Sequence, residues 1–308
     1  MKKVAAGIDI GGTNTIFAWV SEAGDILWSN SVSTTTFATA KALVSEVCDQ
    51  LKSNLLGEAV GLGVGAPSAN FYTGCIEHAP NLNWGDIVPL QQYFEVEMQL
   101  PTIVTNDANA AAIGEQVYGV AKGMKDFMMV TLGTGLGSGF VANGELIYGH
   151  DGFAGELGHT TVEKNGRLCG CGRNGCLETY VSATGIVRTA KEFLDKSSNS
   201  SLADIDVITS KSIYDAAIAG DKLALEIFDF TAEKLGFSLA NTVAITSPKM
   251  IVLFGGLAQS GDLLIKPTKK YLEKYVLSIF KNKIEIVPSK LNASDAAILG
   301  ASALAWKQ

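Results

Sequence analysis

The amino-acid sequence contains one short pattern twice, in which a strand runs into a glycine-rich turn and a second strand follows. Ile8-Asp9-Ile10-Gly11-Gly12-Thr13 aligns with Val130-Thr131-Leu132-Gly133-Thr134-Gly135, and the apolar residues after the two turns match as well. Each copy continues into alternating strand and helix patterns. The sequence therefore predicts an internally duplicated α/β chain.

The expected elements alternate along most of the chain. We predict strands at residues 4–10, 15–20, 26–33, 60–66, 102–105, 127–132, 140–147, 250–254 and 284–287. We predict helices at residues 38–55, 88–98, 109–118, 182–195, 210–219, 221–245 and 263–280, and a last helix from residue 295.

Composition limits the classes of protein to consider. The 308 residues are 47% hydrophobic and 18% charged, which suits a globular chain of two domains. A net charge of −7 without a dense Lys/Arg cluster disfavours nucleic acid as a partner. Asp9 interrupts the apolar stretch after Met1-Lys2-Lys3, and glycines interrupt residues 127–143. We expect no signal peptide, no membrane span and a cytoplasmic location.

The first glycine-rich turn is a candidate nucleotide site. The backbone N–H groups of Gly11, Gly12 and Thr13 can face an anion, and the two glycines permit the positive φ angles that we expect there. Asp9 faces the same space and would repel phosphate directly, so we predict that it holds Mg²⁺ through water. An ordinary glycine hairpin explains the same residues.

Two further glycine clusters are candidate nucleotide contacts. A strand, not a helix, follows the turn of Gly133, Thr134 and Gly135, which argues against a dinucleotide-binding fold. Gly255 and Gly256 follow a strand and precede a helix, which suits adenosine or ribose packed on bare backbone. A simple strand-to-helix turn explains that pair equally well.

Three of the five cysteines lie within eight residues and predict a metal site. Cys169, Cys171 and Cys176, with His159 ten residues upstream of the first, supply a Cys₃His set. Four protein ligands form a closed tetrahedron, so the predicted zinc is structural. The alternative is three free thiols in a glycine-rich turn.

Asp107 is the candidate general base. It follows the strand at residues 102–105 and precedes a helix, so it lies at the carboxyl end of a strand, where ligands of α/β proteins bind. A helix N-cap is the competing role, for which Asp107 and Asn109 are both suitable.

Together these motifs resemble those of the ROK family of bacterial sugar kinases and sugar-responsive repressors. The resemblance runs nearly end to end and rests on residues 9–13, Asn106-Asp107, Gly155-Glu156-Leu157-Gly158-His159 and residues 169–178. It implies an actin-like ATPase fold, in which two RNase H-like α/β domains flank a cleft and the final helix returns to the first domain. We expect residues 1–118 plus 295–308 to form one domain and residues 119–294, with the zinc motif, the other. A homodimer or higher homo-oligomer is also implied.

The resemblance also implies roles for individual residues. Asp107 corresponds to the family's base, and five residues correspond to sugar contacts: Asn81, Asn106, Glu156, His159 and Glu178. A turn role explains Asn81 nearly as well. His159 could bind zinc through one ring nitrogen and the sugar through the other. This chain has Ala66-Pro67-Ser68 where the family usually has Ala-Pro-Gly.

The predicted function is ATP-dependent and Mg²⁺-dependent phosphorylation of glucose to glucose 6-phosphate. The loop at residues 79–84 resembles that of glucose-using members, although a kinase of N-acetylglucosamine or N-acetylmannosamine remains an alternative. A sugar-sensing repressor shares the sugar and zinc motifs. Family repressors carry an N-terminal helix-turn-helix domain, whereas eight residues precede Asp9 here, and the acidic charge disfavours DNA.

Overall fold

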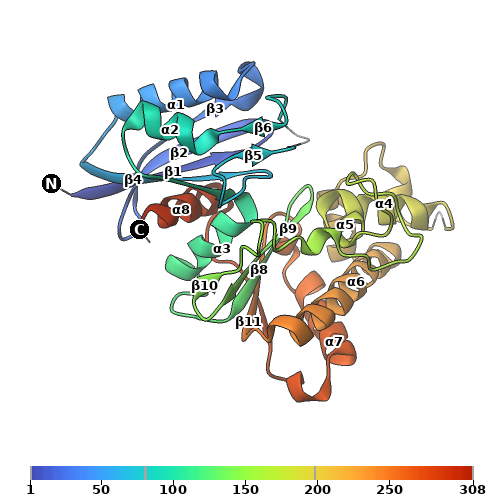
Figure 1. The fold of residues 1–308 in the computed structure, drawn as a ribbon. Helices are drawn as coiled ribbons and strands as arrows, with labels where there is room; N and C mark the ends of the chain where they lie inside the picture. Colours follow the sequence, from blue (N-terminus) through green and yellow to red (C-terminus); the bar gives the residue numbers. More distant parts are fainter. Residues whose placement is uncertain (1, 80–81, 198, 307–308) are drawn as a thin grey trace. The chain divides into compact units, whose positions relative to one another are not determined.

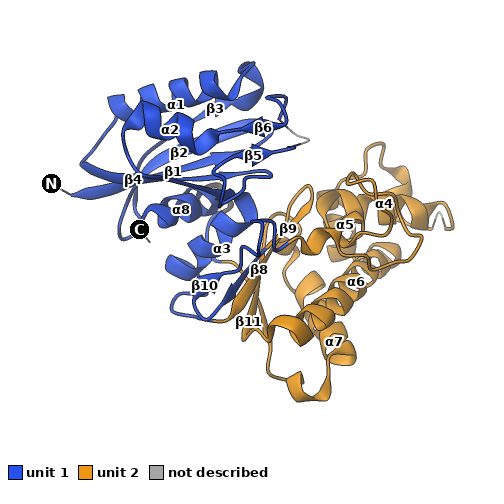
Figure 2. Ribbon diagram, viewed as in Figure 1, with its two compact units in different colours: residues 1–125, 139–155, 290–308 blue, residues 126–138, 156–289 orange. Residues whose placement is uncertain are grey.

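A computed structural model describes residues 2–79, 82–197 and 199–306 (Figure 1). The chain divides into two compact units (Figure 2). Unit 1 comprises Met1–Lys125, Gly139–Gly155 and Lys290–Gln308, and unit 2 comprises Asp126–Ser138 and Glu156–Ser289. Within the described ranges, every helix is too short or too polar to span a membrane.

Unit 1 is built on a five-stranded sheet with the order β3-β2-β1-β4-β7. Its strands are β1 (Lys3–Ile10), β2 (Asn14–Ser21), β3 (Ile26–Ser33), β4 (Glu58–Ala66) and β7 (Thr102–Asn106). β1 pairs antiparallel with β2 and parallel with β4. A separate two-stranded sheet joins β5 (Ile76–Glu77) to β6 (Ile87–Val88).

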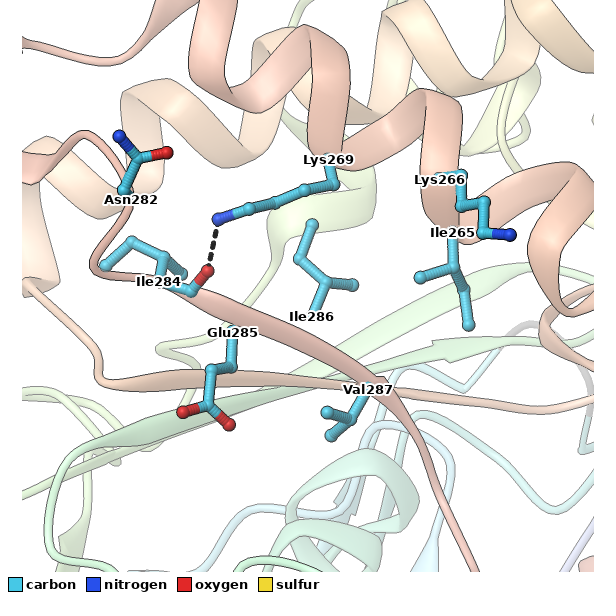
Figure 3. A pocket seen from close by; sticks show the side chains of 8 residues that line it. All are labelled: Ile265, Lys266, Lys269, Asn282, Ile284, Glu285, Ile286 and Val287. Atoms are coloured by element: carbon cyan, nitrogen blue, oxygen red, sulfur yellow. Dashed lines mark hydrogen bonds between the residues drawn. The ribbon is translucent and has the colours of Figure 1, made fainter.

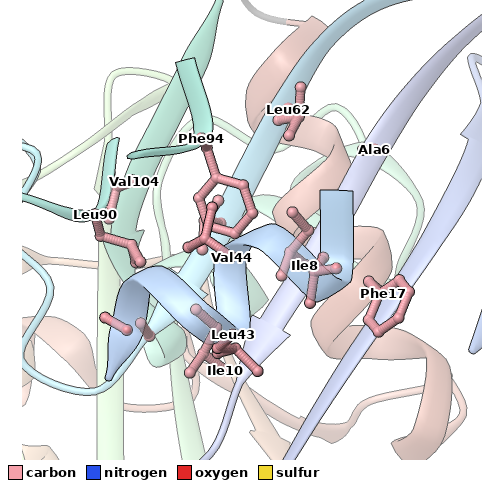
Figure 4. Close-up of a cluster of buried hydrophobic side chains, with 14 of the residues drawn as sticks. Ala6, Ile8, Ile10, Phe17, Leu43, Val44, Leu62, Leu90, Phe94 and Val104 are labelled. Carbon is pink, nitrogen blue, oxygen red and sulfur yellow. The ribbon is translucent and has the colours of Figure 1, made fainter. Parts of the chain in front are cut away.

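Alternating residues of β1 face opposite sides of this sheet. Ala6, Ile8 and Ile10 are fully buried in a core that includes residues of α1 (Ala40–Ser53) and α2 (Leu90–Met98) (Figure 4). The other face carries α3 (Asp107–Val117) and α8 (Ala293–Trp306) (Figure 1). Unit 1 is therefore a sheet between two layers of helices.

Glycines allow α8 to lie directly on the sheet. A Cβ atom added at Gly7 would be 2.0 Å from the Ile298 carbonyl oxygen, and one added at Gly63 would be 1.8 Å from that of Ala301. Gly300 of α8 is equally close to the backbone of α3, because a Cβ there would be 2.3 Å from the Ala110 oxygen. The final helix thus packs in unit 1, backbone against backbone.

The second sheet repeats the strand order of the first. It runs β10-β9-β8-β11-β12, with β8 (Phe127–Leu132), β9 (Leu136–Ala142), β10 (Glu145–Leu146), β11 (Met250–Phe254) and β12 (Glu285–Pro288). β9 and β10 are antiparallel, whereas β11 is parallel to both β8 and β12. Counted along the chain, both sheets have the order 3-2-1-4-5, which confirms the predicted duplicated α/β fold.

Four helices complete unit 2: α4 (Ala183–Leu194), α5 (Ser210–Ile218), α6 (Lys222–Thr246) and α7 (Asp262–Tyr275). The prediction of a helix over residues 263–280 was wrong at its end. Val276 is extended, with φ −71° and ψ 150°, and a separate 3₁₀ turn follows at Ser278–Phe280. Val276 is also buried, so its extended backbone is part of the packed structure.

The compact units do not follow the expected domain boundaries for residues 119–125, 139–155 and 290–294. Residues 139–155 group with unit 1 through α3: a Cβ at Gly139 would be 2.7 Å from that of Ala112, and Gln116 Nε2 donates to the Gly144 carbonyl at 2.8 Å. The domain boundaries stay a prediction.

Candidate functional site

The turn between β1 and β2 is closed by its own backbone. Gly11 N donates to the Asn14 carbonyl at 2.9 Å. The expected positive φ angles were wrong, since neither Gly11 nor Gly12 adopts the left-handed region. A close approach of backbone atoms favours glycine at position 11 instead, because a Cβ atom there would be only 2.9 Å from the Asn14 carbonyl oxygen.

Two acidic residues lie together beside this turn, on either side of Gly65. A Cβ added at Gly65 would be 3.8 Å from Asp9 Oδ1 and 3.6 Å from Asp107 Cα. Loss of hydration raises the pKa of Asp9 to about 7, and the negative charge of Asp107 contributes to that rise. The two carboxylates together therefore favour binding of a proton or of a cation.

Asp107 is the first residue of α3, and Asn106 is its N-cap. The Asn106 side-chain oxygen accepts from Ala108 N at 2.9 Å, and Asp107 Oδ1 accepts from the same N–H at 2.7 Å. Neither Asp107 nor Asn109 is the cap. Asp107 is solvent-exposed, yet the protein atoms around its carboxylate reduce hydration and raise its pKa, against the effect of backbone hydrogen bonds.

In unit 2 the glycine-rich turn at residues 133–135 is held mainly through its carbonyl groups. The Gly133 oxygen accepts from Ala183 N at 2.8 Å, and the Thr134 oxygen accepts from Thr184 Oγ1 at 2.9 Å. No acceptor among the described residues takes the backbone N–H of Thr134 or Gly135. Those two donors can meet an anion.

A pocket of about 290 Å³ lies beside Gly256. It is lined by Ser210, Lys211, Tyr214, Gly256, Leu257, Gln259 and Ser260. Gly255 has φ +99°, and a Cβ there would be 2.6 Å from the Leu132 oxygen, whereas a Cβ at Gly256 would meet open space. Sequence reasoning missed the residues from α5, because only tertiary packing brings α5 to this glycine pair.

A larger and more open cavity, of about 490 Å³, lies between α7 and β12 (Figure 3). Half of its lining residues are aliphatic, including Ile265, Ile284 and Val287, and the others are charged or polar. Lys269 Nζ donates to the Ile284 carbonyl across it. The lining contains none of the predicted site residues, so size alone does not identify the functional site.

The predicted metal ligands come together in unit 2. The ligand atoms of His159, Cys169, Cys171 and Cys176 all lie within 4.8 Å of one another. Cys171 Sγ is 3.6 Å from Cys176 Sγ, and Cys169 Sγ is 3.6 Å from His159 Nδ1. A tetrahedral zinc with Zn–S bonds of about 2.3 Å separates its sulfur ligands by about 3.8 Å. The donor set and its spacing therefore fit zinc.

The two ring nitrogens of His159 face different partners. Nδ1 faces Cys169, whereas Nε2 lies 3.9 Å from Glu156 Oε2. Glu178 adjoins the same cluster, with Oε1 3.8 Å from Cys169 Sγ and Oε2 accepting from Leu136 N at 2.9 Å. The structure thus groups the three predicted sugar contacts of unit 2 around the cysteines. Asn81 lies outside the described residues.

Arg167 anchors the segment that carries these residues, and sequence reasoning missed it. The side chain is buried and donates to the Thr179 and Gly185 carbonyls at 2.6 and 3.1 Å. The guanidinium group also donates to Glu192 of α4, through Nε at 2.8 Å and Nη2 at 2.6 Å. Because Thr179 follows Glu178 directly, Arg167 fixes the turn that presents Glu178.

The sequence profile of the ROK family matches residues 5–308. The chain belongs to the ROK family. This confirms the resemblance that the glycine, acidic and cysteine motifs suggested.

Several known proteins are similar over most of this chain. Glucokinase of Halalkalibacterium halodurans is 40% identical, across 98% of this chain and 94% of that protein. The crystal structure of a ROK family glucokinase from Streptomyces griseus in complex with glucose and AMPPNP has a TM-score of 0.83 and 32% identity, and covers 99% of this chain and 100% of that one. A xylose repressor of Caldicellulosiruptor bescii is 32% identical over 80% of this chain and 62% of the repressor.

Asp9 should make stability depend on pH. Its pKa is about 7 in the folded chain and about 4 in an unfolded one, so the folded state binds the proton more tightly and stability falls as pH rises from about 4 to about 7. Asp9→Asn removes this titration. Without nucleotide or Mg²⁺, we expect the melting temperature of the variant, relative to wild type, to be higher at pH 8 than at pH 5.

Thermal unfolding followed by circular dichroism measures this difference. Asp49→Asn, on the exposed surface of α1, controls for the loss of one negative charge. If Asp9→Asn changed the melting temperature by the same amount at pH 5 and at pH 8, the burial of an ionisable Asp9 would be contradicted.

Proposed function

We propose that this chain transfers the γ-phosphate of ATP to the 6-hydroxyl of glucose and releases glucose 6-phosphate and ADP. The observation that carries the proposal is the Asp107 carboxylate, which lies near Asp9 at the start of α3, in a chain 40% identical to a glucokinase over almost its full length. The higher sequence identity to the glucokinase, 40% against 32% to the xylose repressor, favours a kinase over a repressor.

Asp107 is the proposed general base. Its carboxylate accepts the proton of the 6-hydroxyl while that oxygen forms a bond to the γ-phosphorus and the bond to the ADP oxygen breaks. The raised pKa of Asp107 makes the carboxylate a stronger base than an ordinary aspartate. Asp9 is the proposed partner of Mg²⁺ through water; when bound, the ion neutralises charge on the phosphates.

The proposed nucleotide contacts are backbone groups and one pocket. The backbone N–H groups of Gly12, Thr13, Thr134 and Gly135 suit phosphate, whereas that of Gly11 is taken by the Asn14 carbonyl. The pocket of about 290 Å³ beside Gly256 is near the lower end of the range for small-ligand sites, and suits a nucleoside. Tyr214 supplies an aromatic ring and Lys211 a cation to this pocket.

The proposed sugar contacts are Asn106, Glu156, His159 and Glu178, together with Asn81. Carboxylates and a neutral imidazole accept hydrogen bonds from sugar hydroxyls. Each buried hydroxyl left without a hydrogen-bond partner costs binding free energy. The Cys₃His cluster is the proposed site of a structural zinc, which would tie His159 to the segment leading to Glu178. A homodimer or higher homo-oligomer stays a prediction.

Asp107→Asn should lower kcat by about 10² to 10⁴ while the dissociation constant for glucose changes little. The fold should persist, because Asn106 keeps the N-cap hydrogen bond of α3. Steady-state kinetics, glucose titration and melting temperature together measure this. Asp49→Asn is the control for charge, and near-normal kcat in Asp107→Asn would remove Asp107 from the mechanism.

Among hexoses, glucose should have the highest kcat/KM. An acetamido group needs extra volume at the 2-position, and a polar pocket that binds hydroxyls discriminates by up to about 10⁴ to 10⁵ against sugars that leave its groups unpaired. ADP release measured with glucose, mannose, N-acetylglucosamine and N-acetylmannosamine compares them. A higher kcat/KM for an N-acetylated sugar would replace glucose as the substrate and leave the kinase assignment standing.

If zinc occupies the Cys₃His cluster, metal analysis should find about one zinc per chain, and Cys171→Ser should lower both zinc content and melting temperature. Glucose affinity should fall as well, because Glu178 adjoins Cys169. Cys75→Ser is the matched control, since Cys75 lies in unit 1, outside the cluster. A fully active, zinc-free protein would contradict the proposed metal.

A further inference from the structure

Gly135 of the glycine-rich turn is in direct contact with Glu178, and both belong to unit 2. A Cβ atom added at Gly135 would lie 2.3 Å from Glu178 Oε2 and 3.2 Å from its Cδ. The first distance is far below van der Waals contact, so a methyl group at residue 135 and the carboxylate cannot both occupy these positions. The missing side chain of Gly135 makes the space that the carboxylate fills.

Several contacts hold Glu178 in that space. Oε2 accepts from Leu136 N at 2.9 Å, a hydrogen bond strengthened by the carboxylate charge. The Glu178 carbonyl accepts from Ser182 Oγ at 2.8 Å, which fixes the backbone at the start of α4. A group that pushed the carboxylate away would therefore break the bond to Leu136 and turn the side chain, while the backbone stayed in place.

Resting on the sugar site proposed above, we infer that Gly135 is a positioning residue for the sugar. It lies in the turn proposed for phosphate, yet its absent side chain sets the orientation of a carboxylate proposed to hold sugar hydroxyls. Substitution of Gly135 should consequently weaken sugar binding more than nucleotide binding.

The same turn offers a matched control at Gly133. Neither glycine adopts the left-handed region, so alanine is compatible with the backbone at both positions. A Cβ added at Gly133 meets no atom within 4 Å among the described residues. Gly133→Ala and Gly135→Ala each add one methyl group to one turn, and only the second meets Glu178.

The experiment uses the 308-residue chain after loading with zinc. Calorimetry gives the dissociation constant for glucose, and kinetics give KM for glucose and for MgATP. Gly135→Ala should raise the glucose dissociation constant at least about tenfold, as expected when a sugar hydroxyl loses its hydrogen bond to the charged Glu178 carboxylate. This factor should be larger than the factor by which KM for MgATP rises. Gly133→Ala should change the glucose dissociation constant by less than about twofold.

Wild-type glucose affinity in Gly135→Ala, or an equal loss in Gly133→Ala, would overturn the inference. A wild-type chain that does not bind glucose would instead contradict the proposed function. The two failures are therefore distinguishable.

A double-mutant cycle tests whether Gly135 acts through Glu178. Glu178→Asp withdraws the carboxylate by one methylene, so adding Gly135→Ala in that background should cost less than about twofold in glucose affinity. If the effects of Gly135→Ala and Glu178→Asp on the free energy of glucose binding were fully additive, the contact between the two residues would be contradicted. If Gly135→Ala alone fails to fold, melting temperature decides: restored folding in the double variant supports the contact, and continued failure shows that the methyl group acts elsewhere.

Discussion

The close contact between α8 and the sheet of unit 1 is the constraint on which that unit depends. Helices usually pack through side chains, but here the carbonyls of Ile298 and Ala301 lie where Cβ atoms of the sheet would otherwise be. Glycine at residues 7 and 63 is the condition for this approach. The same approach brings α8 against α3, the helix whose first residue is Asp107. Glycines in the core thus help to place the candidate base.

In unit 2, contacts of the segment from Glu156 to Glu178 position the candidate site residues. This segment has little regular secondary structure, and side chains hold it in addition to backbone hydrogen bonds such as that from Leu177 N to the Thr160 carbonyl at 2.9 Å. Buried Arg167 joins it to α4, and the Cys₃His cluster joins its two ends. Glu178 then meets both the cluster and the turn at residues 133–135. The contacts of Glu178 therefore hold both the candidate sugar site and the candidate nucleotide turn of this unit.

Much of this arrangement could be predicted from local patterns. Alternating apolar residues and glycine turns predicted the duplication and most of the strands in both halves, and the spacing of Cys169, Cys171 and Cys176 predicted the cluster. Features that depend on packing escaped prediction. α7 ends at Tyr275, before the extended Val276, and the role of Gly11 depends on the Asn14 carbonyl rather than on φ.

Long-range contacts were the hardest to foresee. Arg167 sits among glycines and cysteines with no periodic signal, and its side-chain partners are Thr179 and residues of α4. The contact of Glu178 with Leu136 joins residues far apart in sequence, so no spacing rule identifies it. The α5 residues beside Gly256 belong to the same class. Each is a product of the folded chain rather than of any local motif.

The segment composition of the two units has a consequence for synthesis on the ribosome. Unit 1 takes strands from the beginning of the chain and α8 from residues 290–308, whereas unit 2 ends at Ser289. Every residue of unit 2 is therefore translated before α8. Until then the glycine-lined face of the first sheet lacks its helix and stays open to solvent or chaperones. Folding of the later-made unit can precede completion of the earlier-made one.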